Sequence, residues 1–179
     1  MRYNVILHYI LRKKSWGILM DFSIPISTNF SIKGHKEWVA ETYHTHSQIQ
    51  YRLARDLLQR YFSSIGSFSG NEKILDLGCG DGKVTKEIAD QVTSGSVLGI
   101  DYSPSMIDFA RSTYPAKIYS NLEFEQRDAV SFVDDQKFDI VFSFCCLHWI
   151  ENQGLVLRNI YQSLKPGGIF LQLFPTQQG

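Results

Sequence analysis

Five short apolar runs alternate with amphipathic segments from residue 73 onward, and this alternation limits the possible folds more than any other feature of the chain. The runs have the length and residue types of β-strands, and the segments between them carry apolar residues at helical spacing. Such alternation implies crossover connections, parallel pairing and helices on both faces of one sheet. The sequence therefore predicts an α/β protein with a doubly wound parallel sheet. The strands are expected at 73–78, 96–101, 122–129, 138–144 and 168–175, and the helices at 81–92, 103–114 and 152–164.

The region upstream of the first predicted strand divides into a helix and an extension. Ile49, Leu53 and Leu57 recur at four-residue intervals in 47–61, which is typical of a helix with one apolar face. The opening apolar run is interrupted by the basic letters "RKK" and is too short to cross a bilayer, and no signal-peptide cleavage site follows it. This stretch could form an amphipathic surface helix or, as the simpler reading, a loosely attached segment. We expect an N-terminal helical extension at 1–37 and one domain at 38–179.

Charge and cysteine content exclude several classes of protein. The chain has 18 acidic and 18 basic residues, so nothing in its balance indicates a nucleic-acid partner. Cys145 and Cys146 are adjacent and Cys79 stands alone, which fits neither a disulfide framework nor the spacing of metal ligands. We therefore expect a cytoplasmic protein without a metal site, a membrane association or a nucleic-acid partner.

A glycine-rich turn, "GCGDG", follows the first predicted strand. Ligands of doubly wound sheets bind at the carboxyl ends of the strands, and Gly78 and Gly80 allow a ligand to approach the backbone closely. A nicotinamide dinucleotide would need a small residue at position 83, which is Lys83, and would bring its pyrophosphate close to the carboxylate of Asp76. The spacing therefore disfavours a dinucleotide, although it does not exclude one.

Acidic residues end three successive predicted strands: Asp76, Asp101 and Asp128. Asp76 can receive an ammonium group through a charge-assisted hydrogen bond, and Asp101 is placed to hold ribose hydroxyls. Asp128 can accept an adenine amino group, with Tyr102 or Met106 packed on the ring. S-adenosylmethionine carries all these groups and no phosphate. Each aspartate alone could instead cap a helix or lie in a solvated turn, but all three beside the glycine loop favour a cofactor site.

The motifs, taken in order, resemble those of class I S-adenosylmethionine-dependent methyltransferases. The similar segments are "ILDLGCGDG", "VLGIDYSPSMIDFA", "RDA", "FDIVFSFCCLHW" and "LKPGGIFL". The region "SFCCLHWIENQGLVLRNIYQSLKPGG" is most similar to juvenile hormone acid and trans-aconitate methyltransferases, which make methyl esters of small carboxylic acids. The resemblance implies a Rossmann-like fold, S-adenosyl-L-methionine as cofactor and a small-molecule methyl acceptor. It also implies a cofactor site lined by Asp76, Gly78, Gly80, Asp101, Asp128 and Ala129, with the backbone of Phe144 and Cys145 near the methionyl end, and an acceptor site bordered by Gln50, His148 and Trp149. The predicted cofactor site also includes Cys79 of the glycine turn, Tyr102 and Met106.

The chemistry of such a transfer does not require a dedicated base. A carboxylate acceptor is already ionised at pH 7, so positioning can supply most of the catalysis, and no catalytic residue is nominated. His148 could act as a base toward a hydroxyl or amine, but a hydrogen-bonded wall residue is the more common role of such a histidine. Trp149 could offer its indole N–H to a carboxylate or could simply pack against the sheet.

The resembling family usually adds an antiparallel hairpin beyond the fifth strand. The present sequence stops at "LFPTQQG", just after its fifth predicted strand. We therefore expect a class I methyltransferase fold that lacks this hairpin, with an open edge on the fifth strand that invites self-association. Three functional hypotheses follow. The chain is a methyltransferase acting on a small molecule, or it is a non-catalytic module that binds the cofactor or a partner. The third is a nicotinamide-dependent oxidoreductase, which Lys83 and Asp76 argue against.

Overall fold

The computed structural model describes residues 3–4, 8–13, 18–21, 40, 43–44, 47–65, 68–173 and 176–177. Most of them belong to a seven-stranded sheet whose strand order is β3-β2-β8-β7-β4-β5-β6. The five strands predicted from the sequence pair in parallel and form one continuous part of it. They are β4 (Lys73–Leu77), β5 (Ser96–Asp101), β6 (Leu122–Gln126), β7 (Phe138–Phe144) and β8 (Leu164–Leu173). The predicted α/β fold with a doubly wound parallel sheet is therefore confirmed.

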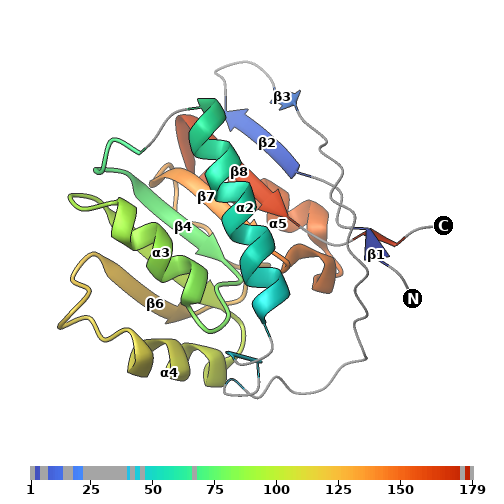
Figure 1. Cartoon of the computed structure of the whole chain (residues 1–179). Coiled ribbons are helices and arrows are strands. Elements are labelled where there is room, and N and C mark those ends of the chain that lie inside the picture. Colours follow the sequence, from blue (N-terminus) through green and yellow to red (C-terminus); the bar gives the residue numbers. More distant parts are fainter. Residues whose placement is uncertain are drawn as a thin grey trace.

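The centre of the sheet is covered on both faces. Ile74 and Leu75 are neighbours on β4 and point to opposite faces of the sheet, yet both are fully buried. One face packs against α2 (Gln48–Ile65), α3 (Lys83–Gln91) and α4 (Pro104–Thr113), and the other against α5 (Gln153–Ser163). Figure 1 shows α2 and α3 in front of the sheet and α5 behind it.

Local sequence explains where these helices begin. Ser103 precedes α4 as its N-cap, accepting a hydrogen bond from the Met106 N–H, and Pro104 takes the first turn. Asn152 caps α5 in the same way through the Leu155 N–H. α3 differs, because the residue before it is Gly82, in the left-handed region at φ 78°, and Asp81 lies just outside the helix.

Strands from the N-terminal region extend the sheet beyond β8. β2 (His8–Lys13) pairs antiparallel with β8, placing His8 opposite Leu173 and Arg12 opposite Ile169. β3 (Ile18–Asp21) then pairs antiparallel with β2 and becomes the outermost strand on this side. The expectation of a helix here is wrong for these two segments, and so is the expectation that the fifth parallel strand, β8, has an open edge. A single sequence gives no sign of this pairing, since its partners lie about 160 positions apart.

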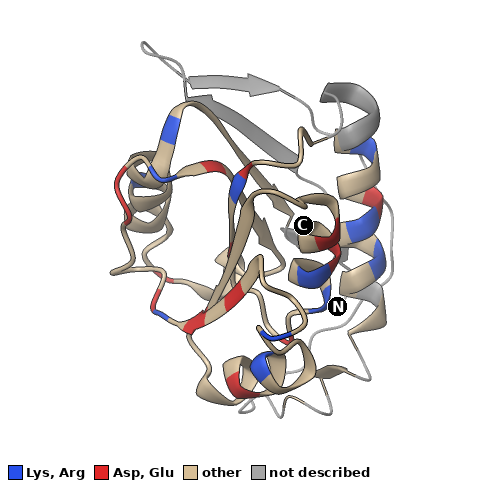
Figure 2. Cartoon of the chain, turned by 90° about the vertical axis from the view of Figure 1, so that its left-hand side faces the viewer, with Lys and Arg blue, Asp and Glu red and all other residues tan. Residues whose placement is uncertain are grey.

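Two further features complete the fold. β1 (Tyr3–Asn4) and β9 (Thr176–Gln177) form a separate antiparallel pair that brings the two ends of the chain together (Figure 1). α2 turns Arg52, Arg55, Asp56 and Arg60 to solvent, and these charges stand along its outer side in Figure 2. Among the residues described above, no helix combines the length and apolar character needed to cross a membrane.

Candidate functional site

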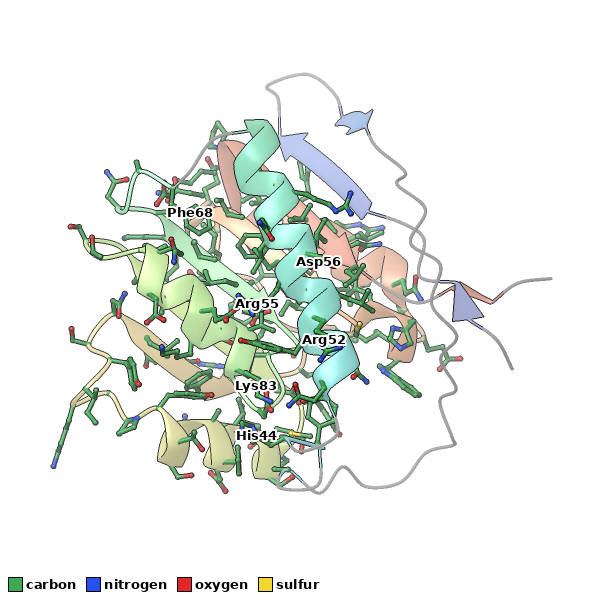
Figure 3. All side chains as sticks on the ribbon, in the orientation of Figure 1. His44, Arg52, Arg55, Asp56, Phe68 and Lys83 are labelled. Carbon is green, nitrogen blue, oxygen red and sulfur yellow. The ribbon has the colours of Figure 1, made fainter. Side chains whose placement is uncertain are left out.

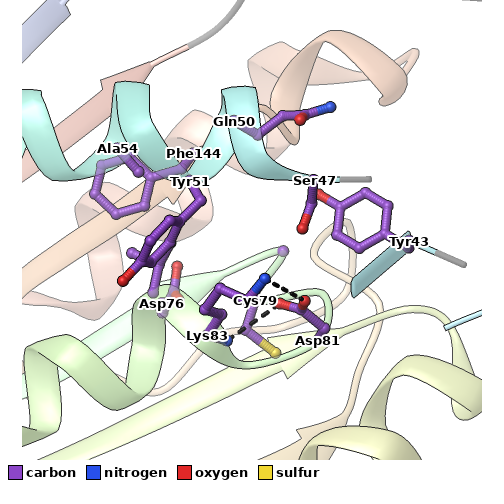
Figure 4. Close-up of a pocket in the computed structure, with 12 residues that line it drawn as sticks. Tyr43, Ser47, Gln50, Tyr51, Ala54, Asp76, Cys79, Asp81, Lys83 and Phe144 are labelled. Carbon is purple, nitrogen blue, oxygen red and sulfur yellow. Dashed lines mark hydrogen bonds and ion pairs between the residues drawn. The ribbon is translucent and has the colours of Figure 1, made fainter. Parts of the chain in front are cut away.

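A pocket lies between the first turns of α2 and the glycine turn that follows β4 (Figure 4). α2 and the residues before it form one wall, and the turn with the start of α3 forms the other. Phe144, at the end of β7, closes one side and stacks on Phe142 with 5.5 Å between ring centroids. The lining residues are Tyr43, Ser47, Gln50, Tyr51, Ala54, Asp76, Gly78, Cys79, Asp81, Lys83, Val84 and Phe144.

The turn after β4 depends on its glycines. Gly78 and Gly80 have φ values of 80° and 53°, which glycine adopts without strain. A Cβ on Gly78 would lie 2.3 Å from the Cys146 Sγ, so the chain after β7 packs directly on this backbone. The N–H groups of Gly78 and Cys79 both donate to the Ile100 carbonyl, at 2.8 and 3.0 Å. The loop is therefore fixed against the end of β5.

Asp76 is the most deeply buried acid of the pocket, with 2% of its surface exposed. The Thr85 hydroxyl donates to its carboxylate at 2.6 Å. Burial raises the pKa of Asp76 to about 7, and the negative charges of Asp101 and Asp81 act in the same direction, while the Thr85 hydrogen bond opposes them. A cationic group in the pocket would therefore stabilise the ionised form.

Asp101, at the end of β5, connects the glycine turn to the start of α4. One carboxylate oxygen accepts from the Gly80 N–H at 3.0 Å, and the other accepts from the Ser103 N–H at 2.9 Å. Burial raises its pKa, whereas these backbone hydrogen bonds lower it. Asp101 thus does act as a local backbone cap, and it also stands beside the loop, where the sequence predicts a ribose ligand.

Asp81 anchors His44, which precedes α2, to the glycine turn. Its carboxylate lies 2.7 Å from His44 Nδ1 and also accepts from the Lys83 backbone N–H at 3.1 Å. The Lys83 ammonium donates to the His44 carbonyl at 2.9 Å and lies 3.8 Å from the Asp81 carboxylate. Figure 3 shows His44 and Lys83 as neighbours between α2 and α4. These contacts hold one wall of the pocket against the other.

The predicted adenine-binding residues lie outside this pocket, near the ends of β5 and β6. Met106 is buried with 3% exposure, whereas Tyr102 is 74% exposed. Asp128 is exposed and accepts from the Val130 N–H at 2.9 Å, and Ala129 is half-buried beside it. Met106 is therefore better placed than Tyr102 for a buried apolar contact.

The residues predicted to border a methyl acceptor differ in their surroundings. Both ring nitrogens of His148 are buried and have no hydrogen-bond partner in the part of the chain that the structure describes, and burial lowers its pKa to about 4. The Gln50 Oε1 is likewise buried and without a partner, and Gln50 lines the pocket. Trp149 is 39% exposed, and its ring centroid lies 4.9 Å from that of His148. The role of His148 at an acceptor therefore stays a prediction.

The pocket thus brings together part of the predicted set and adds residues that the sequence reasoning missed. The predicted residues that line it are Gln50, Asp76, Gly78, Cys79 and Phe144. Gly80 and Cys145 belong to the same loops but do not line it, and Cys145 has a φ of 54° and donates its N–H to the Leu173 carbonyl. The missed residues are Tyr43, Ser47, Tyr51, Ala54, Asp81, Lys83 and Val84. The positions of Asp81 and Lys83 within "GCGDGK" were the available signal.

Comparison with known proteins assigns this arrangement to a family. Residues 68–176 match a family model described as a methyltransferase domain. The protein 235L of Invertebrate iridescent virus 6, which carries a methyltransferase name, is 36% identical over 130 residues, covering 73% of this chain and 45% of that protein. Trans-aconitate 2-methyltransferase of Methylobacterium nodulans is 30% identical, covering 78% of this chain and 50% of that protein. The chain therefore spans about half the length of these curated relatives.

A solved structure agrees in both fold and sequence. The S-adenosylmethionine-dependent methyltransferase from Mesorhizobium loti has a TM-score of 0.53 and 32% identity, over 57% of this chain and 46% of that one. The glycine turn and strand-end acids fit the cofactor that this likeness implies, S-adenosyl-L-methionine, because Asp76 is a buried carboxylate without a cationic partner among the contacts described. The chain belongs to the methyltransferase domain family, within the class of Rossmann-like S-adenosylmethionine-dependent enzymes.

Proposed function

We propose that this chain is the cofactor-binding part of a methyltransferase that transfers a methyl group from S-adenosyl-L-methionine to a small carboxylic acid, giving a methyl ester. The observation that carries the proposal is the pocket at the glycine turn, where Asp76 lies buried with a pKa of about 7. A ligand ammonium would compensate this carboxylate. The name of the relative that methylates trans-aconitate supports an acid as acceptor.

The other residues of the proposed cofactor site follow from the strand ends. Asp101 would receive the ribose hydroxyls, because its carboxylate already lies at the glycine turn through the Gly80 N–H. Met106 would pack against the adenine, and the backbone around Asp128 and Ala129 would receive the adenine edge. Gly78, Cys79 and Gly80 would lie beside the ligand, with Phe144, Cys145 and the exposed Tyr102 at its margins.

The acceptor would lie beyond β7, near Gln50, His148 and Trp149. When bound, the cofactor supplies an electrophilic methyl group on a sulfonium. With its pKa lowered to about 4, His148 is neutral at pH 7, so one ring nitrogen can donate a hydrogen bond to an acceptor carboxylate and the other can accept one. The chain's task would then be to orient the acceptor for in-line transfer and to exclude water, and no base is needed for an ionised acid.

The test begins with binding. Calorimetric titration of the purified chain should show binding of S-adenosylhomocysteine and not of NADH, and Asp101→Ala should weaken that binding at least tenfold. Asp135→Ala is a matched control, because Asp135 is exposed in the loop before β7, at the opposite end of that strand from Phe144. Incubation with labelled cofactor and a panel of di- and tricarboxylic acids then tests for methyl esters. Binding of NADH, or none of S-adenosylhomocysteine by folded protein, would overturn the proposal.

A non-catalytic module that binds the cofactor or a partner is a second candidate function, and the partial coverage of the relatives favours it. The chain corresponds to about half of the proteins that it matches. Binding of S-adenosylhomocysteine without methylation of any acid in the panel would favour that second function.

A further inference from the structure

The proposed methionyl end of the ligand is a zwitterion, and the pocket holds charges of both signs. Asp76 and Asp81 are buried acids, and Lys83 is the only arginine or lysine among the lining residues that the structure describes. Asp76 can pair with an ammonium group, but a ligand carboxylate needs a cation or hydrogen-bond donors in the same pocket. The question is which group supplies them.

Lys83 is held in the pocket by its surroundings. Its side chain is 16% exposed, and the ammonium lies 5.4 Å from the centroid of the Tyr51 ring, which lines the same pocket. One of its three N–H donors is used by the His44 carbonyl at 2.9 Å. The Asp81 carboxylate is farther away, at 3.8 Å, and has a nearer partner in His44.

The ammonium group of Lys83 therefore has N–H donors left that can bind a ligand. Figure 4 shows Lys83 and Asp76 beneath Tyr51 on the same wall of the pocket. In an amino acid, the ammonium and carboxylate are attached to one carbon, so partners for the two groups must lie in one small site. Asp76 and Lys83 meet this condition because both line the pocket.

We propose that Lys83 binds the carboxylate of the methionyl group and, together with Asp76, makes the pocket specific for a cofactor with an intact amino-acid end. This inference rests on the proposed function and adds a residue and a ligand feature to it. Lys83 occupies the position at which a dinucleotide site would need a small residue. In this proposal its positive charge binds the ligand carboxylate. Through its hydrogen bond to the His44 carbonyl it also holds His44 at the start of α3.

The experiment compares ligands that differ in one group. Dissociation constants of S-adenosylhomocysteine and of its decarboxylated analogue are measured by calorimetry for the wild-type chain, Lys83→Met and Lys83→Gln. The wild type should bind the decarboxylated analogue about 10-fold to 100-fold more weakly, as expected for loss of a charge-assisted hydrogen bond. Both variants should bind the two ligands with nearly equal affinity. Lys86→Met serves as the control, because Lys86 lies one turn further along α3 and pairs with Asp90 at 2.6 Å.

A purely structural role for Lys83 gives a different result. If Lys83 only held the segment at His44, its variants would weaken both ligands by the same factor and keep the preference for the carboxylate. That outcome, or a wild-type chain that binds both ligands equally, would overturn the inference and leave the proposed function standing. Because Lys83→Met and Lys83→Gln differ in polarity, either variant that folds is sufficient for this comparison. A folded wild type that binds neither ligand would overturn both proposals.

Discussion

At Asp76, stability and ligand binding should depend on pH in opposite directions. The folded state holds the proton up to about pH 7, whereas an unfolded aspartate loses it near pH 3.8. Between these values the folded state binds more protons, so the free energy of unfolding falls as pH rises, by up to about 1.4 kcal/mol per pH unit. Urea unfolding of the wild type between pH 4 and 8 should show this fall, and Asp76→Asn should reduce it.

Affinity for S-adenosylhomocysteine should change the other way. Ionised Asp76 attracts the ligand ammonium, so binding should strengthen between pH 6 and 8 in the wild type. Asp101, whose pKa is also raised by burial, contributes a change of the same sign, so Asp76→Asn should flatten the profile without abolishing it. If the affinity for S-adenosylhomocysteine depended on pH identically in the wild type and in Asp76→Asn, ionisation of Asp76 would have no effect on binding.

Gly78 should be far less tolerant of a side chain than Gly167, although both have similar φ values of 80° and 83°. A Cβ at Gly78 would meet the Cys146 Sγ at 2.3 Å, whereas nothing lies within 4 Å of one at Gly167. Gly167→Ala should therefore cost about 1–2 kcal/mol for the left-handed backbone alone. Gly78→Ala should cost about 1–3 kcal/mol more, for steric overlap. Equal losses in chemical denaturation would contradict the packing of Cys146 on this loop.

The strand-end acids could be predicted from the sequence, because parallel strands end at one edge of the sheet. Asp76 and Asp101 come together around the glycine turn for that reason. The contact between Lys83 and His44 could not be predicted, since it joins positions 39 apart and depends on how α2 approaches the turn. The exposure of individual side chains could not be predicted either, since Tyr102 is exposed and Met106 is buried.

At the scale of elements, α5 holds the loop that carries Asp128 and Ala129. The buried Asn159 donates through Nδ2 to the carbonyls of Val130 at 2.8 Å and Ala129 at 3.4 Å. Asn159→Leu should destabilise the fold by about 1–3 kcal/mol, because these carbonyls would lose their donor. It should also weaken S-adenosylhomocysteine binding, although Asn159 is not in the pocket.

Leu157→Gln on the same helix is the matched control. Leu157 is 38% exposed, so a polar side chain there should leave unfolding and binding nearly unchanged. If Asn159→Leu lowered stability while ligand affinity stayed at the wild-type value, the loop at Asp128 would have no part in binding.

Elements were predictable where local periodicity and burial agree. The central strands and α4 match their expected ranges closely because their apolar residues and caps are local signals. In α5 the core face is made by Val156 and Ile160, whereas Leu157 faces solvent, so apolar character alone does not identify the buried face. The strands β2 and β3 were not predicted, because the place of β2 in the sheet is set by its pairing with the distant strand β8.

For the whole molecule, β2 and β3 should be needed to keep the chain from self-associating. β2 occupies the edge of β8 along residues 169–173, and without it a run of buried apolar strand would expose its hydrogen-bonding groups. Deletion of residues 1–21 should lower the unfolding free energy and give concentration-dependent oligomers by light scattering. Deletion of residues 1–4 removes β1 alone and should leave the β8 edge paired.

Addition of a synthetic peptide of residues 5–21 to the shortened chain separates loss of the edge partner from general damage. The peptide can add to β8 as an extra strand, which is a known mode of recognition at exposed sheet edges. It should bind with saturation and return the shortened chain to a monomer, since β2 meets β8 through backbone pairing over five residue pairs. A shortened chain that stays monomeric and equally stable without the peptide would show that β2 does not protect this edge, and oligomers that persist at saturating peptide would place their cause elsewhere in the molecule.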